Sequence, residues 1–205
     1  MSPPAPPFAA VVLAAGRSRR AGVCKPAHRH RGRPLLRHAI DGLAVCCRPI
    51  VVVVGHHRDT VGSLLGGLPH VIVVDNDDPD RGMFSSVRTG LAAVGAGARG
   101  VFVLPADCPL VSAGTHAELA AAFLDHGGER PVVPRHAGRG GHPVLLPVSA
   151  REMILAAAGD ATLRDVIREL GPVFLPVDDA AVLMDLDTLA DLLARIVRAG
   201  DDWPE

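Results

Sequence analysis

The chain has 205 residues, of which 48% are hydrophobic and 21% charged, and its formal net charge is −1. This balance excludes a protein that binds nucleic acid through a basic surface, and it excludes a disordered chain of high net charge. The length suits one domain that buries a large core. That core must be aliphatic, because only 3% of the residues are aromatic.

The cysteines and the hydropathy pattern indicate in which cellular compartment we expect the protein. The four cysteines have no CxxC spacing, which argues against a zinc ribbon and favours a reducing, cytoplasmic compartment. No apolar run approaches the ~18 residues that a membrane span needs. We expect residues 1–7 to be a disordered lead-in, residues 8–199 a single domain and residues 200–205 a tail.

Four continuous apolar runs are typical of strands buried on both faces, and stretches with helical periodicity separate them. The runs are residues 8–15, 50–54, 71–74 and 101–104, and the helical stretches are 34–47, 85–94 and 115–124. Strands that alternate with helices form right-handed βαβ units. The pattern therefore predicts an α/β protein with a doubly wound, mostly parallel sheet.

The pattern is less regular beyond residue 125. Short strands are expected at 131–134, 143–147, 173–177 and 182–184, and helices at 150–158, 161–170 and 188–198. In an open α/β sheet the ligand binds at the carboxyl ends of the strands. The loops that follow the strands are therefore the places to look for functional residues.

The loop after the first expected strand, residues 13–25, is suited to bind an anion. Its glycines let a ligand approach the backbone, and Arg17, Arg19, Arg20 and Lys25 can neutralise phosphate oxygens. Lys25 is the only lysine in the chain, and its compact charge suits a tight phosphate site better than a guanidinium does. The loop is neither a Walker A loop nor a GxGxxG motif, which disfavours an ATPase or a dinucleotide-dependent dehydrogenase.

Carboxylates follow two other expected strands. Asp107 lies between Pro105 and Pro109, where it suits Mg²⁺ bound to substrate phosphates, although Asp before proline is equally an ordinary turn residue. Asp185 and Asp187 follow the strand expected at 182–184. We expect Asp185 to contact the metal, while Asp187 suits the N-terminus of the next helix.

Seven motifs stand in an order that resembles the nucleotidyltransferases of molybdenum cofactor maturation, particularly the cytidylyltransferases, over residues 8–198. They are the 13–25 loop, Gly55-His56, Asn76 with Gly82-Met83, and residues 85–88, 106–111, 141–144 and 185–188. The resemblance implies a Rossmann-like (GT-A-like) three-layer α/β sandwich. It also implies Mg²⁺-dependent transfer of a nucleoside monophosphate from an NTP to the terminal phosphate of molybdopterin, with release of pyrophosphate.

The resemblance further implies roles for individual residues. The groups expected to hold the nucleotide are the backbone of the first loop, two cations on the phosphates, and the lining of the base and ribose pocket. These groups are Leu13, Ala14, Ala15 and Gly16; Arg20 and Lys25; and Gly82, Met83 and Ser85. Asp107 would hold Mg²⁺ beside the nucleotide and act in catalysis with Arg20 and Lys25. Asp185 would be the second metal ligand, and Gly141 and His142 would face the pterin substrate.

Ala15 favours CTP, because guanylyltransferase relatives generally carry Leu-Ala-Gly-Gly where this chain has Leu-Ala-Ala-Gly. The expected partners are then CTP, the molybdenum cofactor, and a molybdenum hydroxylase or its chaperone, with no nucleic acid and no membrane. Three alternatives stay open: another NTP such as GTP, a sugar or alcohol phosphate as acceptor, and a non-catalytic molybdenum cofactor chaperone. Residues 26–31 replace an apolar segment of the family, and we expect a solvated basic loop there.

Overall fold

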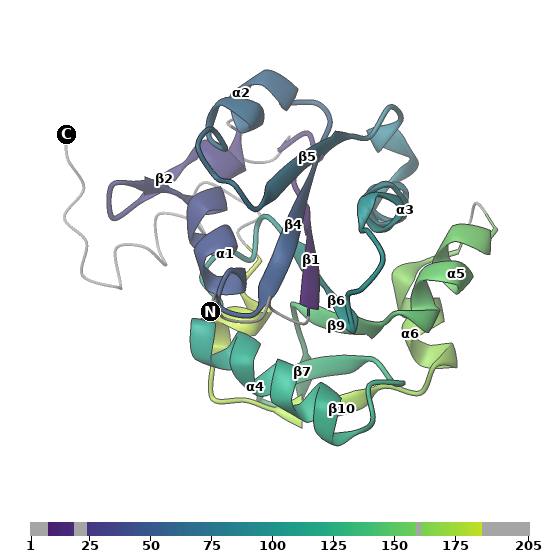
Figure 1. Ribbon diagram of the computed structural model, residues 1–205. Coiled ribbons are helices and arrows are strands. Elements are labelled where there is room, and N and C mark those ends of the chain that lie inside the picture. Colours follow the sequence, from purple (N-terminus) through teal and green to yellow (C-terminus); the bar gives the residue numbers. More distant parts are fainter. Residues whose placement is uncertain (1–7, 19–23, 159–160, 186–205) are drawn as a thin grey trace, which may run out of the picture.

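An eight-stranded sheet organises the computed structural model, which describes residues 8–18, 24–158 and 161–185 (Figure 1). The strands run in the order β10-β7-β9-β6-β1-β4-β5, and β8 pairs with β7 outside this path. The strands of this sheet are β1 (Phe8–Leu13), β4 (Cys47–Val54), β5 (Val71–Asp75), β6 (Gly100–Pro105), β7 (Val132–His136), β8 (Arg139–Gly140), β9 (Val144–Pro147) and β10 (Val173–Pro176).

Helices cover both faces of the sheet. The α-helices are α1 (Leu35–Leu43), α2 (Arg58–Ser63), α3 (Met83–Ala93), α4 (Ala113–Asp125), α5 (Ser149–Ala156) and α6 (Leu163–Glu169). Short 3-10 turns are η1 (Lys25–Ala27), η2 (Pro79–Arg81) and η3 (Ala180–Leu183), and a hairpin joins β2 (Arg29–His30) to β3 (Arg33–Pro34). None of the helices in the described ranges is long and apolar enough to cross a membrane.

Strand β1 is central because both of its faces are apolar. Phe8 and Val12 pack in the cluster that includes α1, α2 and α4, whereas Ala9 and Val11 pack with α3, α5 and α6. Successive strand residues point to opposite faces, so one apolar run supplies both cores. Figure 1 shows α1 and α4 on one side of the sheet and α3, α5 and α6 on the other. The predicted three-layer sandwich is confirmed.

Parallel pairing aligns the ends of the central strands. Both β4 and β6 pair with β1 in parallel, and β5 pairs with β4 in the same way. In the described sheet, β9 runs antiparallel to β6 and to β7. The strands are therefore mostly parallel, as predicted, and the loops that follow β1, β4, β5 and β6 emerge at one edge.

Three expectations about local structure are wrong. The run 71–74, expected to be buried on both faces, forms β5 at the end of the strand order, where Ile72 and Val73 are 43% and 44% exposed. Residues 182–184, expected to be a strand, belong instead to η3 and the residue after it, because the side chain of Asp179 accepts a hydrogen bond from the Ala181 amide (3.0 Å) and caps a turn. The first helix ends at Leu43 rather than at residue 47, and Cys47 begins β4. The lead-in, the helix at 188–198 and the tail lie outside the described residues.

Residues 26–31 form more than a solvated basic loop. They contribute to η1 and to the β2–β3 hairpin, in which the side chains of Arg29 and Arg31 are exposed whereas Pro26 and His30 are buried. The ring of His38 on α1 lies 2.8 Å from the carbonyl oxygen of His30. The buried residues Pro26 and His30 and the contact between His30 and His38 thus hold the hairpin against the first helix.

The contact between α3 and the sheet gives a test of packing. A Cβ added at Gly90 would lie 2.3 Å from Cγ1 of Val11 and 2.9 Å from Cγ2 of Val53. Because both neighbours are stiff β-branched side chains, we expect Gly90→Ala to destabilise the protein by about 1–3 kcal/mol in chemical denaturation. Gly62→Ala on α2, where nothing lies within 4 Å, is the matched control and should stabilise by up to about 1 kcal/mol. Equal effects at the two positions would contradict the packing argument.

Candidate functional site

A cavity of about 500 Å³ lies where the loops after β1, β4, β5 and β6 meet. We call it the nucleotide cavity, after the ligand that the sequence resemblance leads us to expect there. Its lining includes Leu13, Ala15, Gly16, Arg17, Ser18, Lys25, His56, Pro79, Asp80, Gly82, Met83, Ser86, Pro105 and Asp107. The position agrees with the expectation that ligands bind at the carboxyl ends of the strands.

Backbone hydrogen bonds hold the first loop in place beyond the end of β1. The Ala14 amide donates to the carbonyl of Val53 (2.8 Å), and the Ala106 amide donates to that of Leu13 (3.0 Å). A Cβ on Gly55 would come within 2.9 Å of the Ala15 carbonyl oxygen and 3.0 Å of its methyl carbon. The loop therefore needs glycine at position 55, and the methyl group of Ala15 packs against that glycine.

Lys25 and Asp107 meet at this edge of the sheet. The Lys25 Nζ atom lies 3.7 Å from Asp107 Oδ2, and only 11% of the lysine side chain is exposed. Lys25 begins η1 after the first loop, and Asp107 stands in the turn after β6, so the pairing of β1 with β6 brings them together. A largely buried ammonium beside a half-buried carboxylate forms a site in which water screens charge poorly.

Asp107 and Asp185 share a neighbour, the buried thiol of Cys108. Burial raises the pKa of Cys108, and the two carboxylates raise it further while Lys25 opposes them. The thiol therefore stays protonated, so it is unsuited to act as a nucleophile. Both carboxylates therefore lie within electrostatic range of this sulfur, and Asp185 is the last described residue.

These two carboxylates fit a hard divalent cation. Among residues 8–18, 24–158 and 161–185, no group of three or more His, Cys, Asp or Glu side chains could hold a metal by itself. Mg²⁺ commonly takes one or two protein carboxylates and completes its shell with substrate phosphates and water. The donor set of Asp107 and Asp185 thus suits a metal that arrives with a nucleotide.

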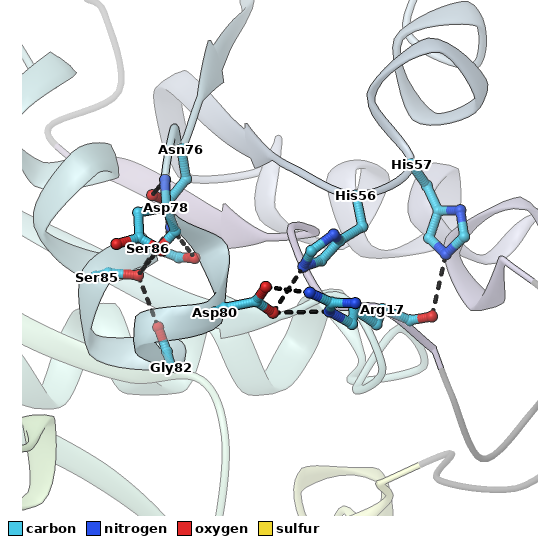
Figure 2. A network of polar contacts seen from close by, with 9 residues as sticks. All are labelled: Arg17, His56, His57, Asn76, Asp78, Asp80, Gly82, Ser85 and Ser86. Atoms are coloured by element: carbon cyan, nitrogen blue, oxygen red, sulfur yellow. Dashed lines mark hydrogen bonds and ion pairs between the residues drawn. The ribbon is translucent and has the colours of Figure 1, made fainter.

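Asp80, in the loop after β5, contacts side chains from the loops after β1 and β4 (Figure 2). Its carboxylate accepts hydrogen bonds from the Arg17 guanidinium, one of them 2.7 Å from Nε, and lies 3.1 Å from His56 Nε2. The Arg17 guanidinium, and then His56, lower the pKa of Asp80 to about 2. His57 donates to the carbonyl oxygen of Arg17 at 3.2 Å. Asp80 is not among the residues selected from the sequence, because a single Asp in a polar loop carries no local signal.

Asn76 holds the start of α3 from inside the protein. Its amide nitrogen donates to Ser85 Oγ (2.8 Å) and to Ser86 Oγ (2.9 Å), while Ser85 Oγ donates to the carbonyl of Gly82 (2.8 Å). Figure 2 shows this network beside the Asp80 cluster. Ser86 lines the nucleotide cavity, whereas Ser85 lines a neighbouring cavity of about 730 Å³ together with Gly82 and Met83. The structure therefore adds Ser86 to the residues selected from sequence.

Gly141 and His142 line a cavity of about 580 Å³, which we call the His142 cavity and which Met83 also lines. The His142 amide donates to the carbonyl of Val182 (2.8 Å), and a Cβ on Gly141 would lie 2.2 Å from that same oxygen. Burial lowers the pKa of His142, although the negative charge of Asp107 opposes the shift. A neutral imidazole therefore stands within electrostatic reach of Asp107.

The structure brings most of the selected residues to one edge of the sheet. Leu13, Ala15, Gly16, Lys25, Gly82, Met83 and Asp107 line the nucleotide cavity. Ala14 lines a small adjoining cavity of about 120 Å³ with Lys25 and Asp107. Arg20 and Asp187 lie outside the described residues. The individual roles assigned to these residues stay predictions.

The chain resembles known proteins over most of its length. The sequence model of the family described as "MobA-like NTP transferase domain" matches residues 10–173. The bifunctional protein GlmU of Sorangium cellulosum is 30% identical over 221 residues, which cover 95% of this chain and 46% of that protein. The chain thus spans about half the length of this curated relative.

Solved structures share the fold. Rv0371c from Mycobacterium tuberculosis H37Rv has a TM-score of 0.79 at 25% identity and covers 95% of this chain and 100% of its own; another structure of it is a complex with manganese. Molybdopterin-guanine dinucleotide biosynthesis protein A from Archaeoglobus fulgidus has a TM-score of 0.68 at 18% identity, covering 93% of this chain and 98% of its own. The latter likeness is one of fold alone.

The Asp80 cluster predicts how acid affects stability. The folded pKa of Asp80, about 2, lies below its ordinary value of 3.8. A depressed carboxyl pKa stabilises the fold above the unfolded value, and this contribution is lost as the pH falls from about 4 to about 2. We expect the unfolding midpoint of Asp80→Asn to change less over this range than that of the wild type. Asp59→Asn, an exposed position on α2, is the control, and identical pH profiles for Asp80→Asn and wild type would refute the assignment.

Proposed function

The chain belongs to the MobA-like NTP transferase family, and from this premise we propose that it transfers CMP from CTP to the terminal phosphate of molybdopterin, with release of pyrophosphate. Family membership supports the coarser part of this proposal, nucleotidyltransferase activity on an NTP. Divalent-metal dependence is typical of the family, and the related Rv0371c was solved with manganese. The finer part of the proposal, namely Mg²⁺ as the metal, CTP as the nucleotide and molybdopterin as the acceptor, is supported by the resemblance of the sequence motifs.

The observation that carries the proposal is the placement of Lys25 and Asp107, 3.7 Å apart, in a cavity formed by the first loop. An oxygen of the acceptor phosphate attacks the α-phosphorus of CTP, and the bond from that phosphorus to the bridging oxygen breaks, so pyrophosphate leaves. Both reactants are anions, and no covalent enzyme intermediate is needed. Positioning and charge neutralisation supply most of the catalysis in such a reaction.

The residues of the cavity have distinct roles in the proposed reaction. The backbone of Leu13 to Gly16 borders the nucleotide, and Lys25, with Arg20 from outside the described residues, neutralises its phosphates. Asp107 and Asp185 would hold Mg²⁺, which neutralises phosphate charge when bound. Gly82, Met83, Ser85 and Ser86 border the base and ribose, and His142 stands on the acceptor side. Poor screening in the half-buried site strengthens each of these charge interactions.

Support for CTP rests on Ala15. Its side chain is 3% exposed and packs against Gly55, so the methyl group fixes the separation between the loops after β1 and β4. Ala15 also lines the cavity. The guanylyltransferase relatives named by the sequence resemblance have glycine at this position, so the support for CTP is the family pattern at Ala15.

Pyrophosphate release by the purified protein with Mg²⁺, molybdenum cofactor and each of the four NTPs tests the proposal. We expect release with CTP, and Asp107→Asn should lower kcat by about 10²-fold or more because it removes a carboxylate from the metal site. Release with GTP instead would correct the nucleotide. Absence of release with every NTP would contradict the proposal, and a molybdenum cofactor chaperone or another phosphate acceptor would then be tested.

Lysine and arginine should differ at position 25. The Lys25 side chain is almost enclosed beside Asp107, and a wider, planar guanidinium would displace the phosphates although it keeps the charge. We expect Lys25→Arg to lower kcat by on the order of ten-fold or more, measured by pyrophosphate release. The control is Arg33→Lys in the exposed pair with Asp41, which should leave kcat unchanged. Unaltered turnover of Lys25→Arg would show that charge alone matters there.

A further inference from the structure

We infer that Asp179 is a positioning residue of the metal site, because it fastens the segment that leads to Asp185 to the segment that follows Asp107. This inference rests on the proposed function and specifies how its two metal ligands are held. The two ligands belong to parts of the chain that are distant in sequence, so tertiary contacts decide how far apart they lie. Asp179 contacts both parts through its two carboxylate oxygens.

The carboxylate of Asp179 accepts hydrogen bonds on both oxygens. Oδ1 accepts from the Ala181 amide at 3.0 Å, within η3. Oδ2 accepts from the Ser112 amide at 3.0 Å and from Thr115 Oγ1 at 2.6 Å, at the start of α4. Hydrogen bonds to an ionised carboxylate are stronger than those between neutral groups. One side chain thus joins η3 to the N-terminus of α4.

The negative charge of Asp179 is needed for both sets of contacts. Burial acts to raise the pKa of this carboxyl group, but the hydrogen bonds from Thr115, Ser112 and Ala181 outweigh burial and lower the pKa. An amide in its place would offer one accepting oxygen instead of two. Asparagine could therefore keep the bond within η3 or the bonds to α4, but not both.

Each of the joined segments carries a proposed metal ligand. On one side, Asp107 stands in the turn that leads from β6 to Ser112, the N-cap of α4. On the other side, Asp185 follows η3, which contains Ala181. A movement of η3 relative to α4 would therefore change the separation of the two carboxylates. Mg²⁺ demands near-ideal octahedral geometry, so such a movement should weaken metal binding.

Apolar packing holds the same segments together but does not fix their relative position. Val111, Val177, Ala181 and Val182 form one buried cluster. Apolar contacts are non-directional, whereas hydrogen bonds require defined distances and angles. The bonds of Asp179 therefore specify where η3 lies against the start of α4.

Binding of CTP with and without metal tests the inference. We would measure Kd for CTP by isothermal titration calorimetry in Mn²⁺ and in EDTA, with no acceptor present. Mn²⁺ should strengthen binding to the wild type. In Asp179→Asn this strengthening should fall by about five-fold or more, because groups that orient metal ligands contribute to metal affinity. Kd in EDTA should stay at the wild-type value.

A merely structural role would give another pattern. Equal strengthening by Mn²⁺ in Asp179→Asn and wild type, or an equal weakening of both Kd values in the variant, would overturn the inference. In pyrophosphate release, the metal concentration at half-maximal rate should rise in the variant while kcat recovers at saturating metal. If GTP rather than CTP supports release, GTP replaces CTP in the titration.

Substitutions at the other end of the contact keep the test independent of how Asp179→Asn folds. Thr115→Val removes the hydroxyl that donates to Asp179 and should reduce the effect of Mn²⁺, whereas Thr115→Ser keeps a hydroxyl and should retain it. Asp165→Asn removes a comparable capping carboxylate from α6 and is the control, with both Kd values unchanged. Unfolding midpoints show which variants fold. A folded Thr115→Val protein with the wild-type effect of Mn²⁺ would contradict the inference.

Failure of this inference differs from failure of the proposed function. If no NTP supports release, yet Mn²⁺ strengthens CTP binding in a way that depends on Asp179, the positioning role stands and the proposed reaction falls. If transfer proceeds and Asp179→Asn matches wild type, the reaction stands and the positioning role falls. The positioning role also falls if Mn²⁺ leaves CTP binding to the wild type unchanged.

Discussion

Parallel pairing of β1 with both β4 and β6 is the constraint on which the site depends. Leu13 at the end of β1 is in register with Val53 of β4 and Pro105 of β6. Because the three strands end together, the loops that contain Lys25, His56 and Asp107 emerge side by side. A shift of register would move these loops apart by a residue spacing of about 3.3 Å and would also reverse which face each side chain occupies.

Charge compensation explains much of the detail at this edge. The proposed substrates are highly charged phosphates, yet two cations at this edge are paired with carboxylates: Lys25 with Asp107, and Arg17 with Asp80. Such pairs hold basic side chains in position before a ligand arrives. Phosphates that bind here compete with these carboxylates, while the carboxylate of Asp107 also suits a metal. The carboxylates thus hold the basic side chains in position in the free site, and in the bound site these side chains can pair with phosphate while Asp107 binds a metal.

The sequence predicts the layers and the location of the site better than it predicts their local details. Long apolar runs located β1, β4, β5 and β6 and the loops after them. Burial on both faces, which these runs also predicted, was wrong for the edge strand β5, because a strand at the edge can carry apolar residues that stay exposed, as Ile72 and Val73 do. Short elements give weaker signals: α2 buries only Val61, and η3 was mistaken for a strand because Val182 is apolar. The contacts of Asp80 and the choice between Ser85 and Ser86 depend on folding. Neighbours distant in the chain decide them, and no local pattern records such neighbours.

The solitary lysine has one more consequence. Amine-directed reagents can modify few groups in this chain: the side chain of Lys25 and the α-amino group of the first residue. Lys25 lies in the wall of the nucleotide cavity, 11% exposed, so the access of a reagent to it depends on what fills that cavity. The extent of Lys25 modification therefore reports whether the cavity is occupied. Mass spectrometry can measure it without an added label and without a tryptophan near the ligand.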